Sequence, residues 1–247
     1  MKSNPQIERD ASPAALRLLA RAPHLERWAA YMHRHRLCAV PFAILIAASV
    51  HSFASTPPPG TPFNAIAWRA TLKTKPSTGV RMGSLHVQLE KTTLDDVRRA
   101  ASAGDIAHQG DAGESIYWLC YTNLSSTPVE RIWIIAHGEM GGPAHFATNI
   151  SAQLLPNGNA TTDCPALPPN LKPLSLDHYI WLNTSASDVL TRLGAPSYQK
   201  GPWRSFDYQG KVSGNCEGGG FDLMTGLLLR FEKGRVISLH LDQVTSC

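Results

Sequence analysis

Two short segments, 92 residues apart, follow one pattern and constrain the fold more than any other feature of the chain. The first is TTLDDVRRAASAGD, residues 92–105, and the second is SASDVLTRLGAPS, residues 185–197. In each segment a Ser or Thr suited to capping a helix precedes an Asp-Val pair, and a glycine follows the apolar positions. Both are therefore predicted to be short amphipathic helices, and their similarity indicates a duplicated unit.

The elements expected around the first helix are strands bounded by turn residues. Alternating or continuous apolar runs predict strands at residues 85–89, 115–122, 130–137 and 144–152, with a glycine-rich turn at residues 138–142. Thr92 or Thr93 is expected to cap the helix and Gly104 to end it.

The second half repeats this order. We predict strands at residues 178–183 and 205–212, and a hairpin over residues 226–244 that turns at Lys233-Gly234. Ser185 should cap the second helix, and Gly194 should end it. The residues of the hairpin expected to face the core are Leu227, Leu229, Phe231, Ile237, Leu239 and Leu241.

These patterns predict an α+β protein of two tandem units. Each unit is a short helical element packed on an antiparallel sheet of about four strands. The units are expected at residues 63–153 and 174–247, separated by a Pro- and Asn-rich linker at residues 154–173. A Pro-rich spacer at residues 55–62 precedes the first unit.

The N-terminal region is typical of a secretory signal peptide. Arg34 and Arg36 precede an apolar run of 14 residues, and the small-x-small pattern ends at Ala54, where we place the cleavage. The run is shorter than the ~20 residues of a membrane span. We therefore predict a signal peptide at residues 32–54, and a soluble periplasmic or secreted product; an uncleaved N-terminal anchor is the alternative. Residues 1–31 are interpreted as a non-native upstream extension.

Charge and cysteine content agree with an exported domain. Residues 55–247 contain 16 Lys and Arg and 16 Asp and Glu, so the expected mature chain is neutral and a poor candidate for nucleic-acid binding. Its four cysteines predict two disulfides, because disulfides persist in oxidising compartments. Three pairings are possible, and sequence proximity favours Cys120–Cys164 and Cys216–Cys247. None of the cysteines has the CxxC spacing typical of a metal site.

A family resemblance is carried mainly by the second half. Its matching positions are Asp188-Val189, Leu193-Gly194-Ala195-Pro196, Phe206, Tyr208 and Lys233-Gly234-Arg235-Val236. This pattern resembles the small envelope domains with the beta-lactamase inhibitory protein fold, a superfamily that includes the SmpA/OmlA-type domain of outer-membrane assembly. The resemblance implies a helical element on a four-stranded antiparallel sheet, with two such units in tandem in the inhibitory protein itself. Because the motifs are a cap, a helix stop and a hairpin, they imply a fold rather than a reaction.

One possible site for chemistry lies at the glycine-rich turn. His137, Glu139 and His145 could bring two imidazoles and a carboxylate around a zinc ion, as in a zinc-dependent hydrolase. A polar hairpin tip is the simpler interpretation, and we predict no cofactor. The chain has no nucleophile elbow and no phosphate-binding loop, so the sequence favours a non-catalytic protein.

The sheet faces opposite the helices are the more favoured binding surfaces. In the first half this face is expected to present Tyr117, Tyr121, Trp133 and His137. In the second half strand alternation places on it the charged or titratable residues Asp207, Arg230, Glu232, His240 and Asp242. Since Tyr and Trp are enriched at interfaces, we predict a protein-binding module, with inhibition as one form of binding, whose partner is an envelope or secreted protein. The alternatives are the zinc-dependent hydrolase and a structural protein of outer-membrane maintenance.

Overall fold

Most of the chain expected after signal cleavage forms two antiparallel sheets with short helices. The computed structural model describes residues 55–60, 70–216 and 219–247, without the side chains of Ala112 and Glu139. The predicted signal peptide and upstream extension, and residues 61–69, lie outside the described residues. The described residues belong to one compact unit.

The larger sheet has eight antiparallel strands in the order β3-β4-β5-β6-β11-β10-β9-β8. In chain order these are β3 (Ala107–Gln109), β4 (Ile116–Asn123), β5 (Val129–His137), β6 (Asn149–Leu155), β8 (Tyr198–Lys200), β9 (Trp203–Val212), β10 (Phe221–Glu232) and β11 (Arg235–Ser246). β6 pairs with β11, so the strands of the two halves join in one continuous sheet instead of two separate sheets of four. The coarse prediction of short helices with antiparallel sheet is confirmed, and the separate sheets are not observed.

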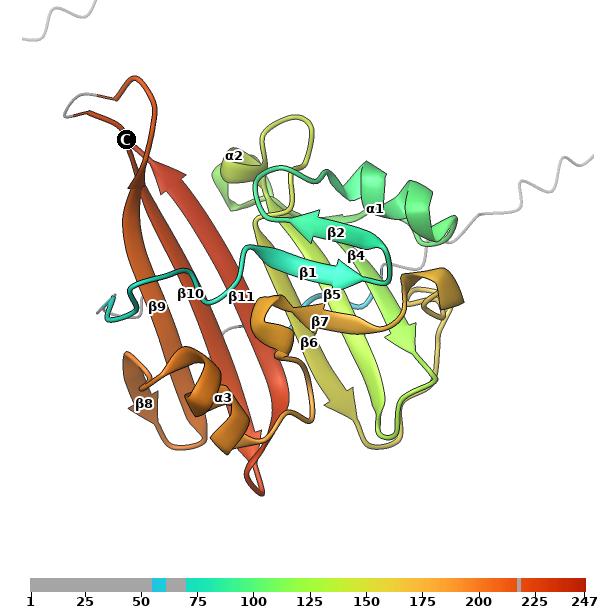
Figure 1. Ribbon diagram of the computed structural model, residues 1–247. Helices are drawn as coiled ribbons and strands as arrows, with labels where there is room; N and C mark the ends of the chain where they lie inside the picture. The colour runs from blue at the N-terminus through green and yellow to red at the C-terminus, as the bar shows by residue number, and fades with distance from the viewer. Residues whose placement is uncertain (1–54, 61–69, 217–218) are drawn as a thin grey trace, which may run out of the picture. The chain divides into compact units, whose positions relative to one another are not determined.

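A second, three-stranded sheet was not foreseen as a separate layer. It has the order β2-β1-β7 and consists of β1 (Gly79–Met82), β2 (Leu85–Gln88) and β7 (Leu174–Leu176). In Figure 1 this sheet and the helices α1 (Leu94–Ala101) and α3 (Ala186–Leu193) lie on one face of the larger sheet. We call that face the inner face and the opposite one the outer face. Shorter helical turns are η1 (Ala112–Glu114), α2 (Gly138–Gly141), η2 (Pro169–Leu171) and η3 (Asp177–Tyr179).

Both predicted helices form, and their caps follow from the sequence. Thr93 and Asp96 make a reciprocal capping box at the start of α1, and the Ser185 hydroxyl accepts the Asp188 N–H at the start of α3. Gly194 follows α3 with a positive φ, as expected. The first helix ends earlier than predicted, because Ser102, directly after Ala101, already takes the left-handed conformation; Gly104, two residues further on, also has a positive φ.

The core lies between the inner face and the layer that covers it. One continuous cluster contains Val80 and Met82 of the small sheet, Val97 of α1, Val189 of α3 and the inner side chains of the large sheet. Its central inner-face members are Leu119, Ile132, Ile134, Ile150, Phe206, Leu227, Leu229, Leu239 and Leu241. At about 25 cal/mol per Å² of apolar surface, this burial is the main stabilising contribution to the fold.

Several local predictions differ from the structure. Residues 178–183 are not a strand, because His178 and Tyr179 take left-handed conformations that end strand geometry. The third strand begins at Asn149 and not at residue 144, and residues 138–141 form the short helix α2 instead of an open turn. The β10–β11 hairpin turns at Lys233-Gly234 as predicted. A register shift at Arg230/Phe231 leaves Ile237 partly exposed and buries Val236 in its place.

Candidate interaction surfaces

The four side chains predicted to share an aromatic face lie on both faces of the sheet. Tyr121 pairs with Ile132 and faces the core, whereas Trp133 pairs with Cys120 and faces outward. Tyr117 lies on the Tyr121 side and His137 on the Trp133 side, because side chains alternate along a strand. The prediction of one aromatic face is therefore wrong. It counted aromatic residues on neighbouring strands without the register that places them.

The two tyrosines are held within the inner layer. Tyr121 is fully buried, its hydroxyl donates to the Ala103 carbonyl at 3.0 Å, and burial raises the pKa of its phenol. The Tyr117 ring stacks against both His108 and His145, with centroids 4.4 and 3.9 Å away. Neither ring presents a free face for a partner.

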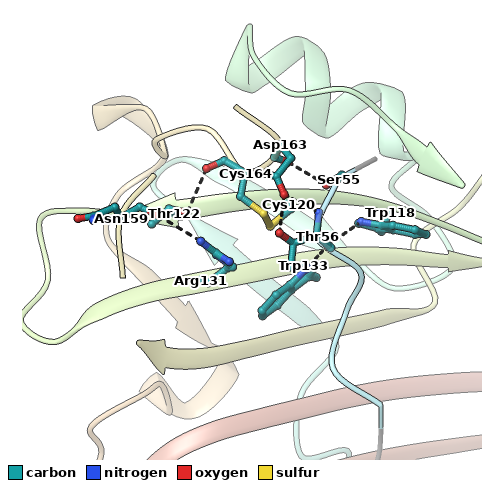
Figure 2. Close-up of a disulfide and its surroundings, with 10 residues drawn as sticks. All are labelled: Ser55, Thr56, Trp118, Cys120, Thr122, Arg131, Trp133, Asn159, Asp163 and Cys164. Atoms are coloured by element: carbon teal, nitrogen blue, oxygen red, sulfur yellow. Dashed lines mark hydrogen bonds between the residues drawn. A yellow bond between two sulfur atoms is a disulfide. The ribbon is translucent and has the colours of Figure 1, made fainter. Parts of the chain in front are cut away.

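Trp133 is covered by segments from elsewhere in the chain. The two disulfides form as predicted, Cys120–Cys164 and Cys216–Cys247. Cys120 and Cys164 pack with Trp118 and Trp133 in a second apolar cluster on the outer face. Figure 2 shows Thr56 beside this disulfide, where its carbonyl accepts the indole N–H groups of Trp118 at 3.0 Å and Trp133 at 2.9 Å. The predicted linker thus packs on the sheet through Cys164, and this part of the outer face is closed to a partner.

Asp163 fixes the N-terminal segment, residues 55–60, over these tryptophans. Its carboxylate accepts the backbone N–H of Thr56 at 2.9 Å and also the Thr56 hydroxyl. The hydrogen bond from the Thr161 side chain, followed by those from Thr56, lowers the pKa of Asp163 to about 2. Ser55, the predicted first residue after cleavage, is buried and donates to the Asp163 carbonyl at 2.8 Å.

The second predicted surface brings titratable groups together on the outer face of β9, β10 and β11. Asp207 and Asp242 both pair with Gly226, and His240 lies two residues before Asp242. Burial raises the pKa of Asp207, and burial followed by the Asp207 charge raises the pKa of Asp242 to about 7. Burial and then the nearby His137 lower the pKa of His240 to about 4. These groups are therefore stabilised in their uncharged forms.

Hydrogen bonds decide what His240 can do chemically. The Thr148 hydroxyl donates to Asn149 Oδ1 at 2.7 Å, which turns the Asn149 amide N–H toward His240 Nε2, 3.4 Å away. With Nε2 as acceptor, the proton of the neutral ring is on Nδ1 and is donated to the Ser151 hydroxyl at 2.6 Å. Since His240 donates to Ser151, it does not act there as the base that a serine nucleophile requires. The network orients side chains within the sheet, and among the described residues Asp207 Oδ2 is a buried oxygen without a hydrogen-bond partner.

Arg230 and Glu232 are separated from Asp207, His240 and Asp242. They lie at the end of the sheet where β10 turns into β11, and both are exposed. The Arg230 guanidinium lies 5.9 Å from the centroid of the Trp203 ring, across the β9–β10 pair. The predicted charged face is thus divided into a part where Asp207 is buried and His240 and Asp242 are half-buried, and a charged exposed end.

The residues of the predicted zinc site are not gathered on one face. His137 faces outward with Ile116, whereas His145 stacks on the inward-facing Tyr117. Within the described residues there is no group of three His, Cys, Asp or Glu side chains placed to hold a metal, and the Glu139 side chain is not among those described. The two imidazoles would have to change faces to share one ion.

Among the residues that the structure describes, the most exposed large hydrophobic side chain was not singled out from the sequence. Tyr179, in η3, is 82 % exposed. The sequence predicts a strand at residues 178–183, because the residues after Tyr179 form an apolar run. Asp177, which precedes this run, is a residue that favours turns.

The Tyr179 loop, residues 177–179, is fixed at each end. Leu176 N–H donates to the Ile180 carbonyl at 2.8 Å, and Ile180 is fully buried. The Asp177 carboxylate accepts the backbone N–H and the hydroxyl of Thr78, at 2.8 and 2.6 Å. Arg192 of α3 donates to the carbonyls of His178 and Tyr179 at 2.8 and 2.7 Å. A loop with two consecutive left-handed, non-glycine residues, each costing about 1–3 kcal/mol, is thereby held in one conformation.

Comparison with known proteins gave no match among family models, curated proteins or solved structures. No helix in the described part of the chain is long and apolar enough to cross a membrane.

Proposed function

We propose that this chain is an exported, disulfide-bonded protein-binding module of two tandem units, and that Tyr179 anchors its partner. The observation that carries the proposal is the 82 % exposure of Tyr179 on a loop whose conformation is already fixed. Tyrosine is among the residues that contribute most at protein interfaces, and a side chain on a rigid loop loses less conformational entropy on binding.

The order of elements supports the tandem arrangement. The first half runs β2, α1, β3, β4, β5, β6, and the second runs β7, α3, β8, β9, β10, β11. In the large sheet the two sets of four strands are arranged symmetrically about the β6–β11 pair. This arrangement supports the duplication predicted from the two helices. Inhibition of the partner stays a prediction.

The cysteines and the predicted signal peptide support a location outside the cytoplasm. Both disulfides join residues that the sequence paired by proximity, and disulfides of this kind persist in oxidising compartments. Together with the predicted signal peptide, this supports a periplasmic or secreted protein whose partner is another envelope or secreted protein.

A binding experiment with matched variants tests this proposal. The processed protein is immobilised, incubated with envelope extract of the source organism, and the captured protein is identified by mass spectrometry and purified. Calorimetry should show binding that Tyr179→Ala weakens by 30-fold or more, the effect of an interface hot spot (≥ ~2 kcal/mol). Tyr198→Ala, which removes an exposed tyrosine from β8, should change affinity less than threefold. Equal affinity of wild type and Tyr179→Ala, or no stoichiometric partner, would reject the proposal.

A further inference from the structure

The segment that covers Trp118 and Trp133 is attached to the large sheet without being one of its strands. Residues 55–60 read STPPPG and form neither helix nor strand. Among the described residues, no backbone–backbone hydrogen bond joins this segment to the sheet. Figure 2 shows it crossing the strands that carry the two tryptophans instead of running beside an edge strand. The segment is therefore held by side chains beneath it, as a bound peptide is held.

Three side chains hold this segment through one residue, Thr56. The indole N–H groups of Trp118 and Trp133 both donate to the Thr56 carbonyl, at 3.0 and 2.9 Å. The Asp163 carboxylate accepts the Thr56 N–H at 2.9 Å and the Thr56 hydroxyl. We call Trp118, Trp133 and Asp163 the tryptophan platform. Four hydrogen bonds from this platform thus fix the residue that precedes the prolines.

The prolines give the segment its conformation before it binds. Proline fixes its own φ near −65°, and the residue before a proline is restricted to extended conformations, so residues 56–59 favour a polyproline II helix in the free chain. Such a segment loses little conformational entropy when it binds, and docking of proline-rich segments on aromatic side chains is a recurring mode of peptide recognition. The platform provides the aromatic rings and the donors that this mode requires.

The segment can leave the platform without disturbing the fold. Ser55 is the predicted first residue after cleavage, so residues 55–60 would be a chain end that unpairs no strand when it moves. The two tryptophans lie on β4 and β5 and pack against the Cys120–Cys164 disulfide, which does not depend on the segment. The platform is therefore built before its ligand arrives.

We propose that the tryptophan platform is a recognition site for a proline-rich segment of another envelope or secreted protein, and that residues 55–60 occupy it as an intramolecular competitor. The ligand class is an extended peptide in which Ser or Thr precedes two or more prolines, because the bound segment has this chemistry. A tethered segment competes from an effective concentration on the order of 1 mM, so it keeps the site closed to weak ligands. This site does not depend on the Tyr179 interface.

A titration with a synthetic peptide tests this assignment. The probe is acetyl-Ser-Thr-Pro-Pro-Pro-Gly-amide with a fluorophore, and its binding to the full processed chain is followed by fluorescence anisotropy. Thr56→Val removes the hydroxyl that donates to Asp163, so it weakens the competing segment and leaves the platform intact. A hydrogen bond to a charged group contributes about tenfold or more in affinity. The variant should therefore bind the probe at least about tenfold more tightly than wild type, because more of its sites are open.

Tryptophan substitutions in the Thr56→Val background locate the binding site. Trp133→Phe keeps an aromatic ring but loses one N–H donor to the bound carbonyl, and should weaken probe binding about fivefold. Trp118→Phe removes the other donor and is a second test of the same kind. Trp181→Phe is the matched control, because it removes a buried indole N–H that has no hydrogen-bond partner, and it should change affinity less than twofold.

Three outcomes would overturn the proposal. The first is that Thr56→Val, with unchanged circular dichroism, binds the probe no better than wild type. The second is that the platform substitutions and Trp181→Phe affect binding equally. The third is dimerisation of wild type without binding of the probe, which would indicate that the segment of a second copy is the occupant.

Discussion

Arg192 joins α3 to the tip of the Tyr179 loop by donating from Nη1 to the Tyr179 carbonyl at 2.7 Å and to the neighbouring His178 carbonyl at 2.8 Å. Both carbonyls belong to residues with positive φ, so one guanidinium holds two backbone units in a conformation that the free chain seldom adopts. The helix that the sequence predicts most clearly thus supports the aromatic residue that the sequence did not single out.

Replacing Arg192 should loosen the Tyr179 loop more than it destabilises the fold. Arg192→Ala removes two hydrogen bonds from an exposed charged group, and we expect a loss of about 1 kcal/mol in the free energy of unfolding. Hydrogen exchange of residues 177–181 should become faster while the β10–β11 amides keep their protection. Arg98→Ala, which breaks an exposed pair with Asp95 on α1, should cost less than about 0.5 kcal/mol and leave the loop unchanged. Unchanged exchange in Arg192→Ala would contradict this role.

His240 and Asp242 should give opposite pH dependences of stability. The pKa of His240 falls from 6.5 to about 4 on folding, so between these values the unfolded chain binds more protons and stability rises with pH. The pKa of Asp242 rises from 3.8 to about 7, so across that window the folded chain binds more protons and stability falls as pH rises. Each contribution is at most about 1.4 kcal/mol per pH unit, and the two largely cancel between pH 4 and 6.5 in the wild type.

Single substitutions should expose each contribution. Asp242→Asn leaves the His240 dependence, so this variant should lose stability on acidification from pH 6.5 to 4. His240→Gln leaves the Asp242 dependence, so this variant should gain stability over the same range. Urea unfolding followed by circular dichroism at several pH values measures both trends, and trends of the same sign would rule out this account.

Capping and alternation made the local elements predictable. Ser185 and Gly194 mark the ends of α3, and Lys233-Gly234 marks the β10–β11 turn, because each residue meets a local backbone requirement. The cysteine pairs followed from proximity in a chain that is predicted to be exported. These signals lie within a few residues of the structure that they determine.

Local sequence signals did not predict which face of the sheet each side chain occupies, or that the strands of the two halves join in one sheet. Whether Tyr121 and Trp133 share a face depends on the β4–β5 register, and whether His240 lies near Asn149 and Ser151 depends on the β6–β11 pairing. Such pairings are set by packing between distant segments. Tyr179 was missed for a related reason, since the conformation of its loop is imposed by Arg192 and Thr78 from other elements.

The two disulfides should differ in their contribution to stability despite closing loops of similar length. Their sequence separations of 44 and 31 residues predict nearly equal loop-entropy contributions of about 4 kcal/mol. Cys120 and Cys164 are also buried against Trp118 and Trp133, whereas Cys247 is exposed. Cys120→Ala/Cys164→Ala should therefore lower the unfolding free energy by about 1 kcal/mol more than Cys216→Ala/Cys247→Ala. Thermal unfolding of both variants measures this difference, and the reverse order would refute it.

Asp163 should stabilise the N-terminal segment only while its carboxylate is charged. Its folded pKa of about 2 lies below the ordinary 3.8, so its contribution is present above pH 3.8 and is lost as pH falls toward 2. Asp163→Asn should reduce the unfolding free energy at pH 7 by about 1 kcal/mol, an amount discounted for partial exposure to solvent.

Because the Thr56 carbonyl accepts both indole N–H groups, releasing Thr56 should also shift the fluorescence of Trp118 and Trp133 toward that of solvated indole. The difference in unfolding free energy between Asp163→Asn and wild type should shrink near pH 2, because the wild-type carboxylate is then protonated as well. Asp105→Asn, at an exposed site after α1, provides the control and should be neutral at both pH values. A stability difference that persists unchanged at pH 2 would show that Asp163 acts through packing and not through its charge.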